Sequence, residues 1–388
     1  MRVLLAVFCL ITTYASAQQQ VGRFAPARTT GKLPMLGYGL GQDRLGGAKL
    51  GMIDTNVLVR VIDSTADMFL LQLSKSHTAY IDKNNLRPDS AYVQKPFYLT
   101  SSWSVKGDDT FDYVTLNVDE RLPYKSWMEV SPSRIIMDIY GVQSNTNWIT
   151  QLKSAQEIKE VYFNQVEDDV VRLTIELKNR QHWGYSIFYE GNNLVVRVRR
   201  QPAALRIKNL KIAIDAGHGG SNTGAAGIKS KTFEKDYTLR FAEELQHYLK
   251  RKKAAVIMTR TSDTNIVNND RVLLLQQEMP VLLISLHLNS SANPAVKGVS
   301  TYYKHIGFKP LTTSILNRML ELNLNEFGNV GNFNFMLSAP TDFPSSLIEI
   351  AFLSNPEDEQ RILDPRFQKA VAKKIFRGIK DWLKWARE

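Results

Sequence analysis

Apolar and polar positions follow two different periods along the chain, and the change comes near residue 208. Before it, short runs alternate; in residues 171–177, Leu173, Ile175 and Leu177 are separated by polar residues such as Thr174. A period of two is typical of strands with one face in a core and the other in solvent. The first half of the chain is therefore predicted to be all-β.

From residue 208 onward, apolar runs alternate with helical patterns. Residues 210–214 and 281–286 are short and almost wholly apolar, which is typical of buried strands. Residues 234–253 place apolar side chains on one helical face and end on the basic residues 250–253, which suits the helix dipole. This order predicts an α/β domain over residues 208–388, with a mixed sheet flanked by helices.

The strand pattern of residues 95–200 contains a repeat. Runs at 113–118 and 134–140 form one strand-turn-strand unit, and runs at 171–177 and 193–199 repeat it at similar spacing. Two copies of one unit predict a symmetric β-sandwich.

The segments around this sandwich have simpler patterns. Residues 18–46 are rich in Gln, Gly, Pro and Thr and are expected to form an irregular leader. Residues 47–90 hold short alternating runs that predict a small β-barrel, and they resemble bacterial SH3-like domains in length and in the strand Ala79-Tyr80-Ile81. Residues 201–207 contain a proline and are expected to form a linker.

The first residues have the order of a secretory signal. Arg2 precedes the apolar run of residues 3–11, and Ala15-Ser16-Ala17 supplies a small-residue cleavage site. We expect residues 1–17 to be removed after Ala17. A membrane anchor is the alternative, but the run is about half of the roughly 20 residues needed to span a bilayer.

The mature chain is expected to be basic and free of thiols. The formal net charge of +11 becomes +10 when Arg2 is lost with the signal. Positive charge suits nucleic acid, an anionic membrane or an acidic polymer. Export argues against nucleic acid, and we expect no transmembrane segment in the mature chain because no later run is long enough. Since the only cysteine, Cys9, lies in the signal, a metal site would use His, Asp or Glu.

Two histidines follow predicted strands. His218 stands in a glycine-rich turn after the first strand of the α/β domain, and His287 ends the run at 281–286. Two imidazoles in these places can meet at one edge of the sheet. Glu234, at the start of the next helix, is an ordinary helix N-terminal carboxylate if taken alone. Together with the histidines it completes the two-His-one-carboxylate set of zinc hydrolases, which keeps a coordination position for water.

Glu349 interrupts an otherwise apolar run at residues 347–352. A carboxylate buried there is costly unless it faces a metal, a cation or water. As a general base it would take a proton from the attacking water and return it to the leaving nitrogen. The alternative is an inward ion pair with an arginine.

Five sequence blocks resemble the zinc-dependent N-acetylmuramoyl-L-alanine amidases of the AmiC type. IAIDAGHGG, FEKDYTLRFAEEL, MTRTSD, LISLHLNS and SSLIEIAFLSNPEDE occur in the order and spacing of that family, over residues 209–388. The resemblance implies one zinc ion bound by His218, Glu234 and His287, with Glu349 as the general base. It also implies hydrolysis of the amide between the lactyl group of N-acetylmuramic acid and the first L-alanine of the stem peptide.

The pattern of two similar strand units in residues 95–200 is similar to that of the AMIN domain. This resemblance implies attachment to peptidoglycan. The resemblances together imply an exported, periplasmic enzyme of cell-wall remodelling or daughter-cell separation, with peptidoglycan as its partner and an activating envelope protein as a further candidate. A zinc peptidase or deacetylase acting on the same polymer, and a wall-binding protein without catalysis, are the alternatives.

The sequence departs from the family at two places. Leu288 follows the second histidine where a small residue is usual, and residues 327–337 replace a stretch that commonly carries an arginine. Only 62 positions separate His287 from Glu349, which is too few for the helical plug of division-associated relatives. Asp215 is expected to fix the glycine turn and to hydrogen-bond a ligand imidazole.

The remaining polar residues of these blocks are expected to have structural roles. Arg260, Asp263 and Arg271 are predicted to form ion pairs. The other histidines of the chain lie outside any pattern of metal ligands; these are His77, His182, His247 and His305.

Overall fold

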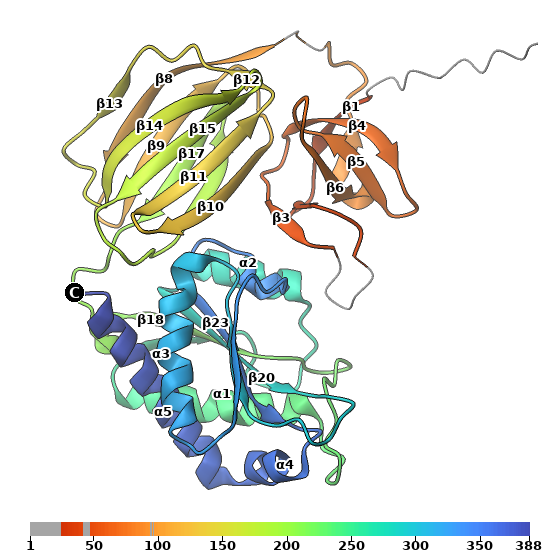
Figure 1. Cartoon of the computed structure of the whole chain (residues 1–388), viewed down its shortest axis with the longest axis vertical. Coiled ribbons are helices and arrows are strands. Elements are labelled where there is room, and N and C mark those ends of the chain that lie inside the picture. The colour runs from red at the N-terminus through yellow and green to blue at the C-terminus, as the bar shows by residue number, and fades with distance from the viewer. Residues whose placement is uncertain (1–24, 42–46, 94, 96) are drawn as a thin grey trace, which may run out of the picture.

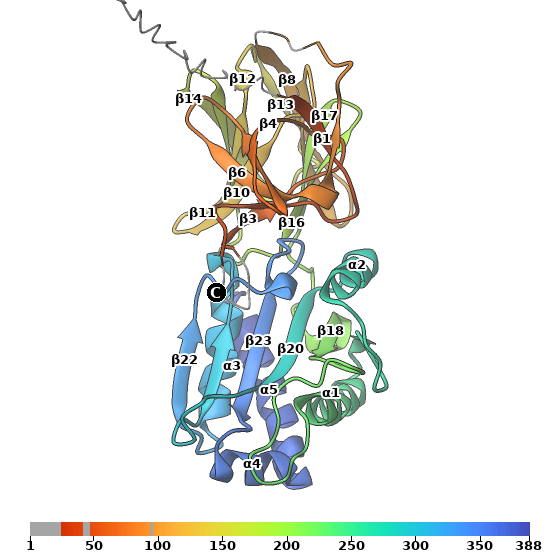
Figure 2. The same cartoon turned by 90° about the vertical axis from the view of Figure 1, so that its right-hand side faces the viewer.

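The computed structural model describes residues 25–41, 47–93, 95 and 97–388. It has two all-β parts followed by one α/β domain (Figure 1). The expected signal, residues 1–17, lies outside the described residues. The two all-β parts lie side by side above the α/β domain in Figure 1, and in Figure 2 the first of them lies in front of the sandwich. No described helix has the length and apolar content that crossing a membrane requires.

The first part is a seven-stranded antiparallel sheet with the order β3-β2-β6-β5-β4-β1-β7. Its strands are β1 (Ala25–Thr29), β2 (Met35–Gly37), β3 (Lys49–Met52), β4 (Leu58–Ser64), β5 (Met68–Gln72), β6 (Thr78–Asp82) and β7 (Leu86–Pro88), with the short 3-10 helix η1 (Lys83–Asn85) between the last two.

The expectation of an irregular leader over residues 18–46 was wrong for two segments of it. Strand β1 pairs with β4 and β7, and β2 pairs with β3 and β6. Pro26 and Gly37 hid these strands, because both residue types are unfavourable in isolated strand patterns.

The second part is a β-sandwich, as the repeat predicted. One sheet has the order β10-β11-β15-β14, and the other has the order β12-β8-β9-β17-β16 with β13 beside β8. Its strands are β8 (Tyr98–Gly107), β9 (Phe111–Val118), β10 (Tyr124–Val130), β11 (Ser133–Tyr140), β12 (Val142–Gln143), β13 (Ile149–Gln151), β14 (Ile158–Glu167), β15 (Val170–Leu177), β16 (Tyr185–Glu190) and β17 (Asn193–Arg199).

The two repeated units contribute equally to this sandwich. In one sheet the first strand of the first unit, β9, pairs with the second strand of the second unit, β17, and in the other sheet β11 pairs with β15. Leu173, Ile175 and Leu177 are buried as predicted, but Thr174 on the opposite face is also buried, at 4% exposure. The outer face of β15 is therefore covered rather than open to solvent at this point.

A continuous hydrophobic core joins the first sheet to the sandwich. Polar contacts reinforce the junction: Arg28 forms an ion pair with Glu120, and Asp54 accepts a hydrogen bond from the backbone of Tyr189. The two N-terminal parts therefore share one core.

The α/β domain is built on a six-stranded mixed sheet, as predicted, with the order β19-β18-β20-β23-β21-β22. The strands are β18 (Lys211–Ala216), β19 (Ala255–Met258), β20 (Leu282–Asn289), β21 (Val299–Tyr302), β22 (Glu326–Val330) and β23 (Ser345–Phe352). Neighbours pair in parallel except β21 and β23, which are antiparallel.

Helices cover both faces of this sheet. The helices are α1 (Glu234–Arg251), α2 (Asn268–Glu278), α3 (Lys309–Leu320), α4 (Pro356–Leu363) and α5 (Pro365–Trp385), and the short 3-10 helices are η2 (Ile207–Asn209), η3 (Ile306–Phe308) and η4 (Met336–Ser338). On β18, Ile212 and Ile214 join the core under α1, α3 and α5, whereas Ala213 joins a smaller core with α2 and η4. Both faces of the strand are thus buried, which explains its almost wholly apolar sequence.

The last two helices begin where the sequence supplies caps. The side chain of Asn355 accepts hydrogen bonds from the first turn of α4, and Asp364 does the same for α5. A proline follows each cap, at the position where its missing N–H costs nothing.

The sandwich contacts the α/β domain directly. Tyr185 and Thr341 exchange backbone and side-chain hydrogen bonds, and Trp183 packs on Trp382 with ring centroids 5.0 Å apart. Leu205 and Ile207, at the end of the expected linker 201–207, are buried in the α/β core. That segment therefore anchors the two parts to each other.

Candidate functional site

The predicted site lies at the carboxyl ends of three neighbouring strands. Strand β18 ends at Ala216 and leads through Gly217 to His218, β20 carries His287, and β23 carries Glu349. His287 and Glu349 stand opposite each other in the parallel register of β20 and β23. Parallel neighbours in register point to the same face, so these two side chains are placed side by side by the sheet itself.

Glu234, the first residue of α1, lies between the two imidazoles. One of its carboxylate oxygens, Oε1, is 3.1 Å from Nε2 of His218 and 3.1 Å from Nδ1 of His287. The same oxygen accepts the backbone N–H of Leu288, and Oε2 accepts that of Ala225. The side chain is almost fully buried, and these four partners compensate the charge that burial would otherwise make costly.

The three residues form a group that could hold a metal ion. One donor atom from each of His218, Glu234 and His287 lies within 4.8 Å of the other two. Ligands of a tetrahedral zinc ion lie about 3.3 Å apart, as bond lengths of about 2.0–2.1 Å require, and the two distances above are close to that value. His218 Nδ1 lies 2.8 Å from the side-chain oxygen of Asn222. Since an amide oxygen only accepts, Nδ1 carries a proton, and Nε2 is the nitrogen of this ring that could bind a metal ion.

A further observation fits a bound cation, because glycines leave room for the three donors. A Cβ on Gly217 would lie 2.3 Å from Cε1 of His287, and a Cβ on Gly224 would lie 2.5 Å from Oε2 of Glu234.

The charges of the group reinforce one another. Burial opposes ionisation of Glu234, but the hydrogen bonds from His218 and His287 outweigh it and hold its pKa far below the ordinary value. Burial lowers the pKa of His287, yet the hydrogen bond and charge of Glu234 raise it overall. The site therefore attracts positive charge, whether a proton or a metal ion.

Glu349 lines the same hollow, which has a volume of about 440 Å³ and also contains the three donors. It is half-buried and is not one of the three grouped donors. Among the described residues, no Arg or Lys lines this hollow. A carboxylate beside a metal-binding group, but outside it, is placed to handle protons.

Asp215 helps to fix the glycine turn, as predicted, but its hydrogen-bond partners differ from the predicted ones. Its oxygens accept hydrogen bonds from Arg271, Thr259 and Ser285 rather than from a ligand imidazole. Burial raises the pKa of Asp215, but Arg271 and the other partners bring it below the ordinary value. Arg271 also donates to the carbonyl of His218, so the pair fixes the turn that carries the ligand.

Of the other two residues that were predicted to form ion pairs, Asp263 forms one and Arg260 has other partners. Asp263 pairs with Lys235 at 2.6 Å and accepts the backbone N–H of Gly220, so it belongs to an ion pair as expected. Arg260 instead donates to backbone carbonyls, including those of Ala216 and Gly217. It braces the glycine turn without a carboxylate partner among the described residues.

Sequence reasoning did not single out three residues that lie in or beside the hollow. Asn222, which orients His218, could have been suspected from its place in the same glycine-rich loop. Phe333 and Phe335 also line the hollow, and the ring of Phe335 lies 5.6 Å from that of His287. These aromatics come from a segment without a strand or helix pattern, so only the fold brings them to the site. Of the other histidines, none lines it.

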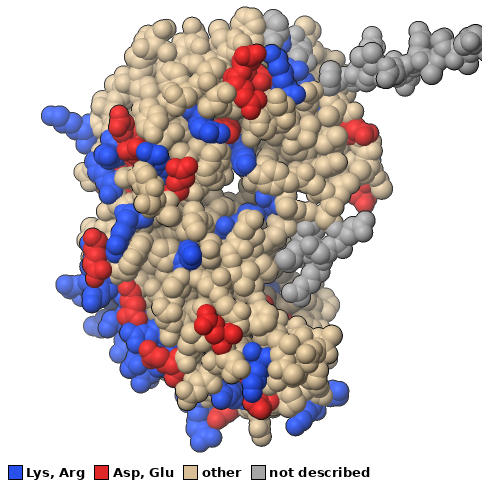
Figure 3. Space-filling view, viewed as in Figure 1, with Lys and Arg blue, Asp and Glu red and all other residues tan. Residues whose placement is uncertain are grey.

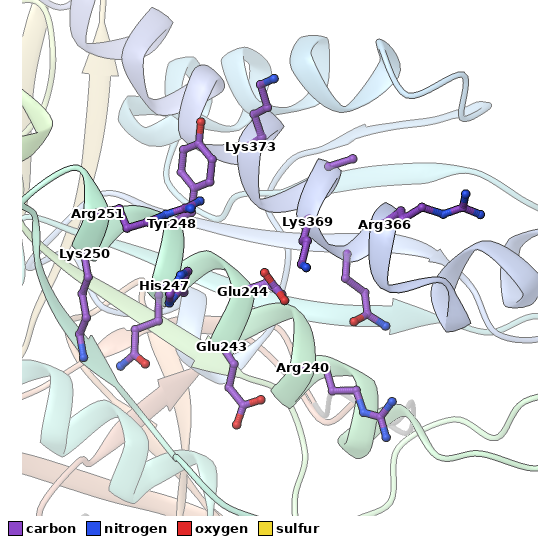
Figure 4. A pocket seen from close by; sticks show the side chains of 13 residues that line it. Arg240, Glu243, Glu244, His247, Tyr248, Lys250, Arg251, Arg366, Lys369 and Lys373 are labelled. Carbon is purple, nitrogen blue, oxygen red and sulfur yellow. The ribbon is translucent and has the colours of Figure 1, made fainter.

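A larger groove, of about 970 Å³, lies elsewhere, between α1 and α5 (Figure 4). Its basic lining residues are Arg240, Lys250, Arg251, Arg366, Lys369 and Lys373, with Glu243 and Glu244 among them. Figure 3 shows Lys and Arg gathered along the edge of the α/β domain where α5 lies. The groove contains none of the candidate ligands, so the site is identified by its donor atoms and not by cavity size.

Known proteins resemble both halves of the chain. The N-acetylmuramoyl-L-alanine amidase family matches residues 212–381, and the AMIN domain family matches residues 103–198. The probable cell wall amidase LytH of Staphylococcus saprophyticus is 31% identical over 189 residues, which are 48% of this chain and 63% of that protein. The chain thus spans less than two thirds of the length of LytH.

A solved structure and a second related protein are also similar to this chain. The catalytic domain of CwlV, an N-acetylmuramoyl-L-alanine amidase from Bacillus (Paenibacillus) polymyxa, is 32% identical, with 45% of this chain and 98% of that chain covered and a TM-score of 0.43. The germination-specific N-acetylmuramoyl-L-alanine amidase of Bacillus subtilis is 32% identical over 198 residues, 46% of this chain and 82% of that protein. The family match and the similarity to this last relative, most of whose length is covered, show that the chain belongs to the N-acetylmuramoyl-L-alanine amidase family.

Proposed function

We propose that the protein is a zinc-dependent N-acetylmuramoyl-L-alanine amidase of the cell wall. It hydrolyses the amide between the lactyl group of N-acetylmuramic acid and the first L-alanine of the stem peptide. The observation that carries this proposal is the hollow in which His218, Glu234 and His287 converge beside Glu349. Family membership supports the choice of bond.

His218, Glu234 and His287 would hold the zinc ion. When bound, zinc supplies a Lewis acid that polarises a carbonyl oxygen and makes water a stronger nucleophile. The protein's contribution is to present three donors in a nearly buried group, two of them fixed by hydrogen bonds: His218 by Asn222, and Glu234 by the N–H groups of Ala225 and Leu288. Fixed donors leave little reorganisation for the reaction.

Glu349 is the proposed general base. Its carboxylate lies beside His287 across β20 and β23 and opens into the hollow that would hold the scissile amide. It takes a proton from the attacking water and delivers it to the alanine nitrogen as that nitrogen leaves. The hollow walls contain Leu288, Leu347 and two phenylalanines, which keep bulk water away from this transfer.

The N-terminal half is proposed to bind the enzyme to its polymer. The match to the AMIN domain family over residues 103–198 supports attachment of the sandwich to peptidoglycan. The protein would act outside the cytoplasm, in the periplasm, during wall remodelling or daughter-cell separation. An activating envelope protein remains a proposed partner.

Digestion of purified peptidoglycan, followed by mass analysis of the fragments and parallel measurement of zinc, tests the reaction. Free stem peptides that begin at L-alanine are expected. Release of acetate would instead indicate a deacetylase, and shortened stem peptides would indicate a peptidase. Binding without any product would indicate a wall-binding protein.

Two variants with matched controls test the roles of the residues. His218→Ala is expected to lose both zinc and activity, whereas His77→Ala, in the N-terminal sheet and outside the hollow, should lose neither. Glu349→Gln is expected to keep zinc and lose activity, with the exposed Glu326→Gln as its control. Activity in Glu349→Gln comparable to the unmodified chain would contradict its role as the base.

A further inference from the structure

Two phenylalanine rings form an apolar wall of the catalytic hollow. Phe333 and Phe335 both line it, their ring centroids are 6.1 Å apart, and their planes are inclined by only 35°. Phe335 packs edge-on against His287, and Phe333 packs on Tyr302 at 4.5 Å. The wall is therefore in direct contact with a proposed metal ligand at one end.

The residue between the two rings is held by the N-terminal sheet. The side-chain oxygen of Asn334 accepts the backbone N–H of Lys49 at 3.1 Å, and its side-chain nitrogen donates to the carbonyl of Gly47 at 2.9 Å. The ammonium of Lys49 in turn donates to the backbone carbonyl of Asn334 at 3.0 Å. Three hydrogen bonds thus connect the start of β3 to the centre of the wall.

Other contacts extend this connection. Leu33 and Met52 of the N-terminal sheet pack against the same small core as Phe335 and Met336. The ammonium of Lys304, beside β21, donates to the carbonyl of Lys49. The wall segment contains no regular strand or helix between β22 and η4. Its position is therefore fixed by these contacts and not by secondary structure.

We propose that Phe333 and Phe335 form a subsite for one sugar ring of the wall polymer, and that the N-terminal sheet sets its position through Asn334. This inference rests on the proposed function, because the lactyl group of the scissile amide is attached directly to the sugar ring. A sugar presents a face of C–H groups, which packs on the electron-rich face of an aromatic ring. Its hydroxyl and amide groups find polar partners at the edge of the hollow, in Asn289 and Ser290.

The charges of the hollow favour the sugar over the stem peptide as the occupant of this wall. Stem peptides carry free carboxylates, and none of the described residues that line the hollow is a Lys or Arg that could pair with them. A neutral ring loses little by entering an apolar wall, whereas an unpaired carboxylate loses its hydration. We therefore place the glycan on the wall and the peptide toward the open side.

Titration of the full-length, zinc-loaded protein with two non-cleavable probes tests the subsite. The disaccharide of N-acetylglucosamine and N-acetylmuramic acid reports on the wall, and D-lactate reports on the metal group alone. Phe333→Ala and Phe335→Ala are expected to weaken disaccharide binding about fivefold, the loss of one aromatic contact. D-lactate binding and zinc content should not change.

Asn334→Ala tests the positioning role, since it removes two of the three connecting hydrogen bonds while leaving both rings in place. It should weaken disaccharide binding about threefold, the equivalent of a single net hydrogen bond, without changing D-lactate binding. Matched controls are Phe327→Ala and Asn325→Ala, which are exposed residues outside the hollow.

Each outcome decides the proposal. Unchanged disaccharide binding in the Phe variants, or no disaccharide binding by the unmodified protein, would overturn the subsite. Equal loss of D-lactate and disaccharide binding would mean that the rings only support the metal group. Unchanged binding in Asn334→Ala would overturn the positioning role alone. Because no probe is cleaved, the amidase activity stands or falls separately, in the peptidoglycan digestion.

Discussion

Gly217→Ala is expected to remove zinc from the site while leaving the protein folded. The added Cβ would lie 2.3 Å from Cε1 of His287 and 2.6 Å from both of its ring nitrogens, whereas ordinary contact begins at 3.4 Å. The ring must therefore retreat by about 1 Å, because the methyl group is attached to backbone. Zinc sites tolerate about 0.2 Å in their bond lengths, so a shift of this size disrupts coordination.

The surroundings of His287 prevent an easy adjustment. The side chain is 9% exposed, packs against Phe335, and is hydrogen-bonded to Glu234. Overpacking in a dense interior costs about 1–3 kcal/mol, which a protein of this size can absorb without unfolding. Loss of a partner that only orients a ligand already weakens metal affinity 10–100-fold, so displacing the ligand itself should cost about 100-fold or more.

Zinc content after dialysis against a series of zinc buffers measures this effect, with thermal unfolding and peptidoglycan digestion alongside. The matched control is Gly39→Ala, whose Cβ would have nothing within 4 Å. The control should bind zinc and cleave peptidoglycan as the unmodified chain does. Full zinc affinity in Gly217→Ala would refute the reasoning, because it would mean that His287 is not a ligand or that the turn moves freely.

Three further predictions concern the rest of the chain. Substitution of Glu234 by Gln should lower zinc affinity and also thermal stability, since the lowered pKa of the carboxylate reflects its hydrogen bonds with the two imidazoles; equilibrium dialysis and calorimetry would measure both. Burial lowers the pKa of His182 to about 4 from 6.5, so the unfolded chain takes up a proton that the folded chain refuses, and stability should fall as the pH drops from about 6.5 toward 4. The loss from this group is limited to about 3 kcal/mol, at about 1.4 kcal/mol per pH unit, and urea unfolding at pH 7.5 and 4.5 with and without His182→Gln should reveal it; an identical pH dependence in the two proteins would contradict the assignment. In the groove between α1 and α5, the double reversal Lys369→Glu/Lys373→Glu should weaken sedimentation with peptidoglycan at low salt and have little effect at high salt, because exposed charges are screened. The equal reversal Lys32→Glu/Lys309→Glu, at exposed positions outside the groove, should have a smaller effect, and equal effects would assign the binding to net charge alone.

The residues that the structure groups as possible metal ligands could be found from the sequence because their positions depend on local pattern. His218 and His287 directly follow or end apolar runs, and Glu234 starts a strongly patterned helix, so strand and helix ends alone bring them to one edge of a sheet. Glu349 stood out as a charge in an apolar strand. The alternation in residues 171–177 likewise gave the inner face of the sandwich.

The errors arose where tertiary contacts outweigh local pattern. Strand β1 contains Pro26 and is held by pairing with β4 and β7, which no local signal indicates. Thr174 is covered on the outer face although its polarity suggests solvent. The partners of Asp215 and the wall residue Phe335 depend on contacts between distant segments, for which a single sequence carries no period or motif.

The register between β20 and β23 has a consequence for how this chain can change over evolution. His287 and Glu349 are opposite each other, and the residues next to Glu349 are Ile348 and Ile350. Because side chains alternate between faces, deleting or inserting one residue upstream within β23 would point Glu349 to the wrong face and present an isoleucine in its place. A point substitution in these strands changes one side chain, whereas a change in strand length moves Glu349 away from the site and is expected to abolish activity. Insertions and deletions should therefore accumulate in the loops of this domain and be absent from its two central strands.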